Sequence, residues 1–293
     1  MKQLLPLGRC CFAMAMVAFG IQHFIYGDFV TRVLPSWPAW IPGHALWAYL
    51  IGAVLVAAGG AILLQFRSRG AALLLAALLL LSFVFLGLPL AVADMAWGGK
   101  WTNAGKALAL CGGAIAVALS SRSADGETIR LPGGLIVVGR LFFSAFLILG
   151  GIQHFIWSQF VKTMVPSWIP GPVFWTYFAG VALIAGGVGI VLPQTTRLAE
   201  RRTGVMTFQK RLLYALRVTM RLAAPCTGVM IFLWVILLHI PRAMANLHDS
   251  NETTAVFEAL AFSGIAFVLS GMSAPVQDPS SPEASSPARL MAT

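Results

Sequence analysis

Charged side chains are scarce in this sequence. Asp, Glu, Lys and Arg make up 10% of the 293 residues, against about a quarter in soluble globular domains. Hydrophobic residues make up 58%, and the mean hydropathy is +0.83. The alternation of apolar and polar residues that marks a membrane β-barrel is also absent. Several apolar runs reach the length of about 20 residues that a bilayer crossing needs, so the composition predicts a polytopic α-helical membrane protein.

Cofactor and nucleotide motifs are missing as well. The four cysteines (Cys10, Cys11, Cys111 and Cys226) form no CxxC pair, and the absence of CxxCH argues against haem. No Walker, Rossmann or nucleophile-elbow pattern occurs. Glycine pairs such as 112–113 and 150–151 indicate close helix packing instead of phosphate-binding loops. The net charge of +10 does not predict nucleic-acid binding, because the basic residues lie in short loops between apolar runs.

An internal repeat dominates what is present. The sequence of residues 20–25, GIQHFI, recurs 131 positions later at 151–156. The offset changes to 128 after Trp37, where the first copy carries three extra residues, and a weaker match at an offset of 152 aligns Lys106 with Glu258. Matches between the copies include Pro35-Ser36-Trp37 with Pro166-Ser167-Trp168, Trp47 with Trp175, Tyr49 with Tyr177, and Leu88-Pro89 with Ile240-Pro241. The repeat indicates duplication of one structural unit.

The repeat unit contains four membrane spans. The predicted spans are 10–27, 45–65, 71–92, 104–120, 134–157, 173–193, 222–241 and 254–272. Because four is an even number, both copies enter the membrane from the same side, which makes this a parallel repeat. The predicted fold is all-α, with eight transmembrane helices as two parallel-repeated four-helix bundles. The predicted domains are a first repeat at 1–121, a cytoplasmic linker at 122–133, a second repeat at 134–272 and a disordered tail at 273–293.

The distribution of basic residues predicts the orientation. Fifteen of the 20 Lys and Arg residues fall on the side of the N-terminus, so the positive-inside rule predicts that both termini are cytoplasmic. An insert of about 24 residues in the second copy includes 197–221, where Val205, Phe208 and Leu212 recur at helical spacing with Lys210 and Arg217 on another face. This pattern predicts a basic amphipathic helix on the inner leaflet, with a solvated basic loop as the alternative.

Ionisable residues near the outer ends of the spans are the candidate functional groups, because a charge in the hydrocarbon region is costly. The candidates for chemistry are His154, His239, Arg242 and Glu258, all at one depth in the second copy. The first copy has Gly87, Leu90 and Lys106 at the positions of His239, Arg242 and Glu258. We therefore predict an active pocket in the second copy. Either Lys106, across the pseudo-twofold axis, or Arg242 would neutralise Glu258.

Candidate ligand-binding residues lie near the depth that these four residues share. They are His23, Lys106, Trp168, Trp175 and Tyr177, and the aromatic ones flank a Pro-Ser-Trp break that predicts a short interfacial or re-entrant loop on the outer face. A structural alternative exists for His23 and His154, whose Gln-His pairs would bond loop carbonyls freed by the following prolines. His154, His239 and Glu258 have the chemistry of metal ligands, but their spacing matches no known motif, so no metal is predicted.

The repeated GIQHF, Pro-Ser-Trp and Ile-Pro-Gly pieces, with His239-Ile240-Pro241-Arg242 and Glu258-Ala259-Leu260-Ala261, resemble the DoxX-like family of small bacterial four-span proteins. The resemblance covers both halves and implies a bacterial inner-membrane protein. It matches His154, Arg242 and Glu258 to recurring polar positions of the family, from which copy one departs at Leu90 and Lys106. Some members are linked to quinone-coupled sulfur oxidation or thiol redox complexes.

Two functional hypotheses follow. The first is a quinone-linked redox component, working with a redox partner subunit, in which His154 or His239 exchanges a proton with a quinone oxygen. The aromatic loop would shield the quinone ring. The second is a non-enzymatic membrane carrier or scaffold that binds a small or lipidic ligand in the same polar cluster. The sequence alone does not decide whether the protein is an enzyme.

Overall fold

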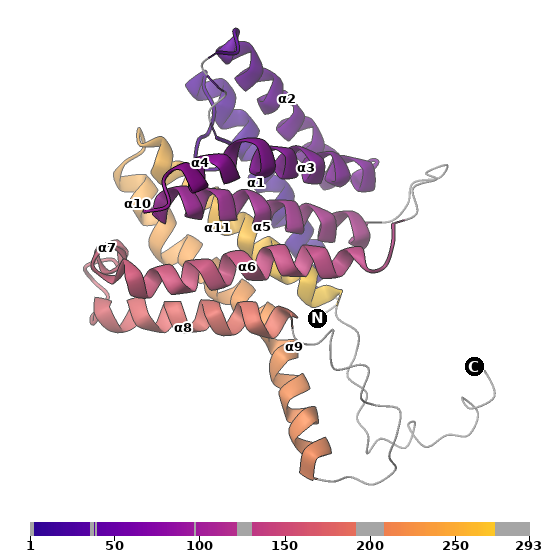
Figure 1. Cartoon of the computed structure of the whole chain (residues 1–293), viewed down its shortest axis with the longest axis vertical. Helices are drawn as coiled ribbons and strands as arrows, with labels where there is room; N and C mark the ends of the chain where they lie inside the picture. The colour runs from indigo at the N-terminus through magenta and orange to yellow at the C-terminus, as the bar shows by residue number, and fades with distance from the viewer. Residues whose placement is uncertain are drawn as a thin grey trace, which may run out of the picture.

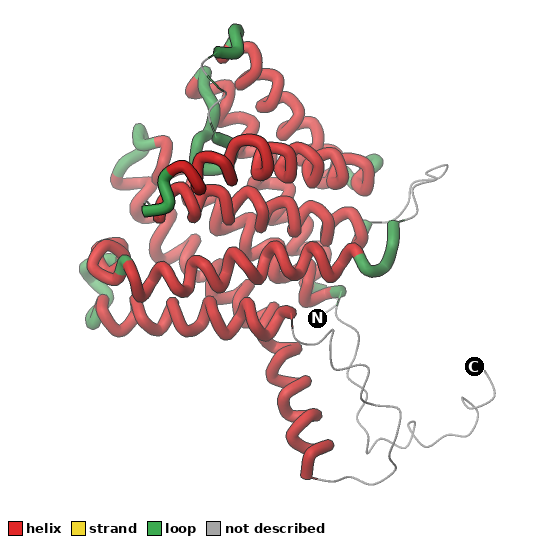
Figure 2. Tube along the Cα trace, in the orientation of Figure 1, coloured by secondary structure: helices red, strands yellow, loops and turns green. Residues whose placement is uncertain are grey.

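A computed structural model describes residues 3–35, 38, 40–96, 98–121, 131–191 and 208–272. In this part of the chain every regular element is a helix (Figure 2). The first repeat consists of α1 (Leu4–Tyr26), α2 (His44–Leu63), α3 (Ser68–Ser82), the π-helix η1 (Phe83–Gly87), α4 (Leu88–Ala93) and α5 (Gly98–Ser120). The second consists of α6 (Leu135–Ile156), α7 (Ser158–Val161), the 3₁₀-helix η2 (Lys162–Met164), α8 (Pro172–Val191), α9 (Phe208–Trp234), the π-helix η5 (Val235–His239), α10 (Ile240–Ala245) and α11 (Ser250–Gly271).

Eight helical spans are long and apolar enough to cross a membrane among the described residues. The third is composed of α3, η1 and α4, and the seventh of the later part of α9 with η5 and α10. The prediction of an all-α, eight-span membrane protein is therefore confirmed. The predicted tail 273–293 and most of the linker lie outside the described residues.

The third and seventh spans share a local irregularity. In each, a five-residue π-helix comes directly before a short α-helix that carries proline in its first turn, Pro89 in α4 and Pro241 in α10. Proline has no N–H to donate to the carbonyl four residues earlier, and the wider π turn accommodates the missing bond. In the second repeat this irregular turn carries His239.

The two repeats interlock. Helix α1 packs against α11, the last helix of the other repeat, and α6 packs against α5 in the equivalent way (Figure 1). Helices α5 and α11 also touch each other. They are the most buried spans, because 72% of the residues in the membrane window of α5 and 78% of those in α11 are buried. The four-helix units are therefore not two self-contained bundles, because the central pair α5–α11 is shared.

Glycine permits this interlocking. A Cβ on Gly8 of α1 would lie 2.5 Å from the carbonyl oxygen of Gly264 in α11, and a Cβ on Gly112 of α5 would lie 2.5 Å from that of Gly139 in α6. These four residues are equivalent pairwise in the repeat, so the same backbone contact occurs twice. Small residues let membrane helices approach closely, and the interpretation of Gly112 as a packing residue is confirmed.

The insert of the second repeat is only partly described. Residues 197–207 lie outside the described residues, whereas 208–220 form the first part of α9 and precede its membrane span. In Figure 1 this part of α9 projects from the bundle, steeply inclined to α6 and α8. The prediction of a helix here is confirmed from residue 208, but the helix is continuous with the seventh span instead of being a separate element.

Candidate functional site

The acidic residues that the structure describes, with the cations that pair with them, gather at one end of the bundle, where α1, α4, α6 and α10 end and α2, α5, α8 and α11 begin. We call this the polar end. Glu258 lies eight residues into α11, about 12 Å along its axis, and its side chain is 4% exposed. The Lys106 Nζ atom of α5 lies 2.9 Å from Glu258 Oε2 and 3.0 Å from Oε1, with the lysine side chain 8% exposed. Equivalent positions of the two repeats thus form a buried ion pair across the pseudo-twofold axis.

Arg32 is the third member of this cluster. Its Nη2 donates to Glu258 Oε2 at 3.0 Å, and its side chain is 32% exposed. Arg32 lies in residues 27–43, which connect α1 to α2; we call the described residues of this connection, 27–35, 38 and 40–43, the cap segment. Sequence analysis missed this contact because Arg32 is one of the basic residues in short loops between apolar runs, where solvation is a sufficient explanation for a charge. Its counterpart at the offset of 131 is Thr163, which is the one signal that could have singled it out.

His23 holds the cap segment against the bundle. The ring is fully buried; its Nδ1 lies 2.7 Å from the carbonyl oxygen of Phe19, and its Nε2 accepts the N–H of Val30 at 3.4 Å. These two bonds fit a neutral imidazole that carries its proton on Nδ1. Val33 and Leu34 of the segment are themselves buried against the bundle. The structural alternative therefore describes His23, although the loop group it binds is an N–H and not a carbonyl.

Glycine defines both ends of the cap segment. Gly27 has φ +63° and Gly43 has φ +80°, in the left-handed region that other residues rarely adopt. These two residues let the chain turn where it leaves α1 and where it enters α2. The segment therefore brings Arg32 from outside the spans to the buried carboxylate of Glu258.

The equivalent segment of the second repeat is exposed. Phe160 is 61% exposed, whereas its counterpart Phe29 is 7% exposed. His154 keeps one bond of the pair, with Nδ1 2.7 Å from the carbonyl oxygen of Gly150, and its ring stacks on Trp234 at a centroid distance of 6.4 Å. His154 therefore faces α9, and no described contact joins it to Glu258.

The predicted aromatic ligand residues lie on this exposed side. Trp168, Trp175 and Tyr177 are exposed, and Trp175 donates its ring N–H to the carbonyl oxygen of Pro170 at 3.2 Å. Exposed tryptophan and tyrosine residues at the ends of spans are typical of the level of lipid headgroups. Among the described contacts, it is Arg32 of the cap segment, and not a residue of the aromatic loop, that reaches Glu258.

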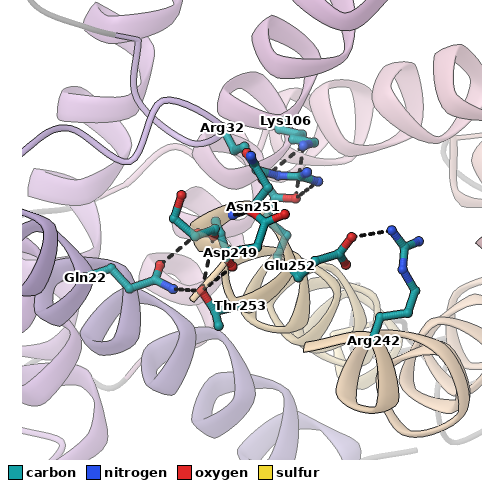
Figure 3. A network of polar contacts seen from close by, with 11 residues as sticks. Gln22, Arg32, Lys106, Arg242, Asp249, Asn251, Glu252 and Thr253 are labelled. Atoms are coloured by element: carbon teal, nitrogen blue, oxygen red, sulfur yellow. Dashed lines mark hydrogen bonds and ion pairs between the residues drawn. The ribbon is translucent and has the colours of Figure 1, made fainter. Parts of the chain in front are cut away.

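His239 and Arg242 reach the polar end from η5 and α10. Arg242 forms its ion pair with Glu252 in the first turn of α11, so the predicted alternative of an Arg242–Glu258 pair is wrong (Figure 3). His239 is the last residue of η5, which packs against α11, the helix that carries Glu258. Its Nδ1 is buried and has no hydrogen-bond partner, a condition it shares with Arg32 Nε. The cluster therefore draws on both repeats, and not on the second repeat alone as predicted.

Neutral hydrogen bonds fix the helices around the cluster. Gln22 of α1 donates to Thr253 at 3.3 Å and accepts from Thr254 at 3.1 Å, which ties α1 to α11 (Figure 3). Its counterpart Gln153 accepts from Thr102 at 2.7 Å and ties α6 to α5. Beside Gln153 an apolar cleft of about 290 Å³ opens between α5 and α6. Among the described residues no three His, Cys, Asp or Glu side chains gather as a metal site would need.

Comparison with protein-family models gives a match to part of the chain. The family model described as "Domain of unknown function (DUF8561)" matches residues 143–241, which run from α6 to the start of α10. This stretch includes His154 and His239 but neither Lys106 nor Glu258. No curated protein and no solved structure matches the chain.

Proposed function

We propose that this integral membrane protein binds a small or lipid-borne ligand at its polar end, as a carrier or scaffold. The observation that carries the proposal is the surplus of hydrogen-bonding nitrogens in the buried cluster. Arg32 Nε and His239 Nδ1 are both buried without a partner. A buried polar group left without a hydrogen bond costs about 1–3 kcal/mol, so a ligand with oxygen atoms at this place is favoured.

The state of Glu258 supports a binding role over a catalytic one. A general acid or base has to reach the proton that it transfers. The Glu258 side chain is 4% exposed, and its carboxylate accepts hydrogen bonds from both Lys106 and Arg32. In this arrangement the carboxylate orients two cations instead of exchanging a proton with a ligand.

A quinone-linked redox component is the second candidate, and His239 is the residue that favours it. A quinone carbonyl is a suitable partner for the unpaired ring nitrogen of His239. The resemblance to the DoxX-like family supports the same ligand class. Because the sequence has no built-in cofactor motif, this role requires a bound quinone or a redox partner subunit.

The resemblance to the DoxX-like family and the distribution of basic residues also support a location for the ligand-binding site. The proposed membrane is the bacterial inner membrane, with both termini in the cytoplasm. The polar end then faces the outer leaflet. The ligand would reach Arg32 from the level of the lipid headgroups, since this side chain is the partly exposed member of the cluster.

The test is the identification of molecules that stay bound to the full-length protein in a mild detergent. Extracts of wild type, Arg32→Gln and His239→Ala are compared by mass spectrometry, with Lys100→Gln as a matched control. Lys100 lies at the same end but pairs with Asp94 at the surface. We expect one molecule per chain in wild type and control, and its loss in both cluster variants.

The identity of the bound molecule separates the two candidates. A quinone, together with an effect of the protein on quinol oxidation, would establish the redox role. Another lipid or small molecule with no such effect would establish the carrier or scaffold role. Equal retention by all four proteins, or no retained molecule, would refute a site at the polar end.

A further inference from the structure

We infer that the ligand is an anion, and that Arg32, Lys106 and His239 form a binding site for a phosphate oxyanion with one negative charge. This inference rests on the proposed function and names the ligand class of the same site. It depends on three observations: the charge balance of the cluster, the geometry of its free nitrogens, and the difference between the two repeats.

The cluster carries one positive charge in excess. Two cations, Arg32 and Lys106, share the single carboxylate of Glu258. The other carboxylates described at the polar end make their contacts with groups outside the cluster: Asp28 with His44, Asp94 with Lys100, Glu252 with Arg242, and Asp249 with the N–H of Asn251. A surplus charge beside side chains that are less than 10% exposed is poorly solvated, so a counter-anion is favoured.

The free nitrogens suit an oxyanion. Arg32 uses Nη2 to bind Glu258, whereas its buried Nε has no partner. Guanidinium nitrogens form charge-assisted hydrogen bonds to phosphate oxygens, and Nε and Nη1 of Arg32 are not used by Glu258. His239 Nδ1 is a second unpartnered nitrogen, and Lys106 provides a point charge. The arginine side chain is about one-third exposed, which leaves the site an open side toward the headgroup level.

The two repeats differ at the position of Arg32, the residue that would bind the anion. The first repeat has Arg32 in its cap segment, and the second has Thr163 at the equivalent position. The lysine beside Thr163, Lys162, bonds to Gln159 at the surface and has no carboxylate beneath it among the described contacts. The structure therefore predicts one anion site per chain. Lys162 supplies a control at the equivalent place of the other repeat.

A phosphodiester of a membrane lipid and free inorganic phosphate share this chemistry. The charge of one on a lipid phosphodiester equals the excess charge of the cluster. The cap segment follows directly after the span α1, so the proposed site would lie at the level of the lipid phosphates. The experiment below distinguishes these two sources.

The test titrates the full-length protein in mild detergent with four probes: short-chain phosphatidylglycerol, inorganic phosphate, an uncharged diacylglycerol and a short-chain quinone. Binding is measured by calorimetry, and the number of bound molecules by native mass spectrometry. We expect one phosphatidylglycerol per chain and an affinity at least tenfold lower for Arg32→Gln. Arg32→Lys keeps the charge without the guanidinium group and should lie between the two, whereas Lys162→Gln should bind like wild type.

The probes separate the possible outcomes. Binding of phosphatidylglycerol but not of free phosphate assigns the site to a lipid headgroup, and Arg32-dependent binding of free phosphate assigns it to the soluble anion. Equal affinity for diacylglycerol, quinone and phosphatidylglycerol would overturn the inference and leave the proposed function intact. Arg32→Gln binding as tightly as wild type would also overturn it. Failure of all four probes would count against both.

Discussion

Replacement of Glu258 by glutamine should destabilise the protein more than any other single change in the charged cluster. The change keeps the size of the side chain but leaves Lys106, with a side chain that is 8% exposed, facing Arg32 without an anion between them. Breaking a buried ion pair by removing one partner costs about 3–5 kcal/mol. We expect a loss of this size in the free energy of unfolding.

Because Glu258 contacts both Lys106 and Arg32, loss of Lys106 should destabilise the protein less than loss of Glu258. Lys106→Met leaves Glu258 bonded to Arg32 at 3.0 Å, so its cost should be that of one charged hydrogen bond, about 1.5–3 kcal/mol. The double variant Lys106→Met/Glu258→Gln removes the stranded lysine and should be more stable than Glu258→Gln alone. Lys100→Met breaks a pair whose side chains are 40% and 43% exposed and should cost about 0–1 kcal/mol.

Buried cysteines provide the assay. Cys11 and Cys111 are 2% and 1% exposed, whereas Cys10 and Cys226 are exposed. Unfolding in increasing sodium dodecyl sulfate should therefore show a fast baseline of thiol labelling by a maleimide dye, followed by a cooperative rise as the buried thiols become accessible. If Glu258→Gln unfolds at the same detergent fraction as Lys100→Met, the buried pair does not stabilise the fold and the reasoning fails.

Three further outcomes are expected. Gly112→Ala forces a methyl group to 2.5 Å from a backbone oxygen of α6 and should lose about 1–3 kcal/mol in the same assay, whereas Gly60→Ala, with no atom within 4 Å, should be neutral or stabilising. His23→Ala removes the bond to the cap segment and should speed proteolysis within that segment several-fold, while His154→Ala should not; equal rates would contradict the role of His23. Alkaline phosphatase fused within the linker between the repeats should be inactive in a bacterial host, and an active fusion there would reverse the proposed orientation.

The sequence was sufficient to predict the membrane spans and to recognise the duplication. Hydropathy sums over local windows, and repeat identity is read directly from the chain, so neither depends on how the helices pack. The alignment of Lys106 with Glu258 at one depth also follows from topology. From the sequence, either Lys106 or Arg242 could be the cation that neutralises Glu258. Only the structure shows that Lys106 pairs with Glu258 and that Arg242 pairs with Glu252.

Arg32 shows where reasoning from the sequence stopped. A basic residue in a loop between spans is normally explained by solvation, and nothing in its neighbours points to a carboxylate 226 positions away. The cap segment reaches Glu258 because α1 packs against α11 of the other repeat. The aromatic loop of the second repeat has the same sequence motif but remains exposed, so the motif alone does not tell which copy reaches Glu258.

By itself, the sequence determined an eight-span helical membrane protein made of two copies of one unit, with charged residues at equivalent depths. The tertiary structure decided that the copies interlock through α5 and α11 and that the ionic cluster is shared between them. The physical reason is that membrane helices are apolar on every side, because lipid is as apolar as a protein core. Their hydropathy pattern therefore reports that a helix crosses the bilayer but not which neighbour it contacts.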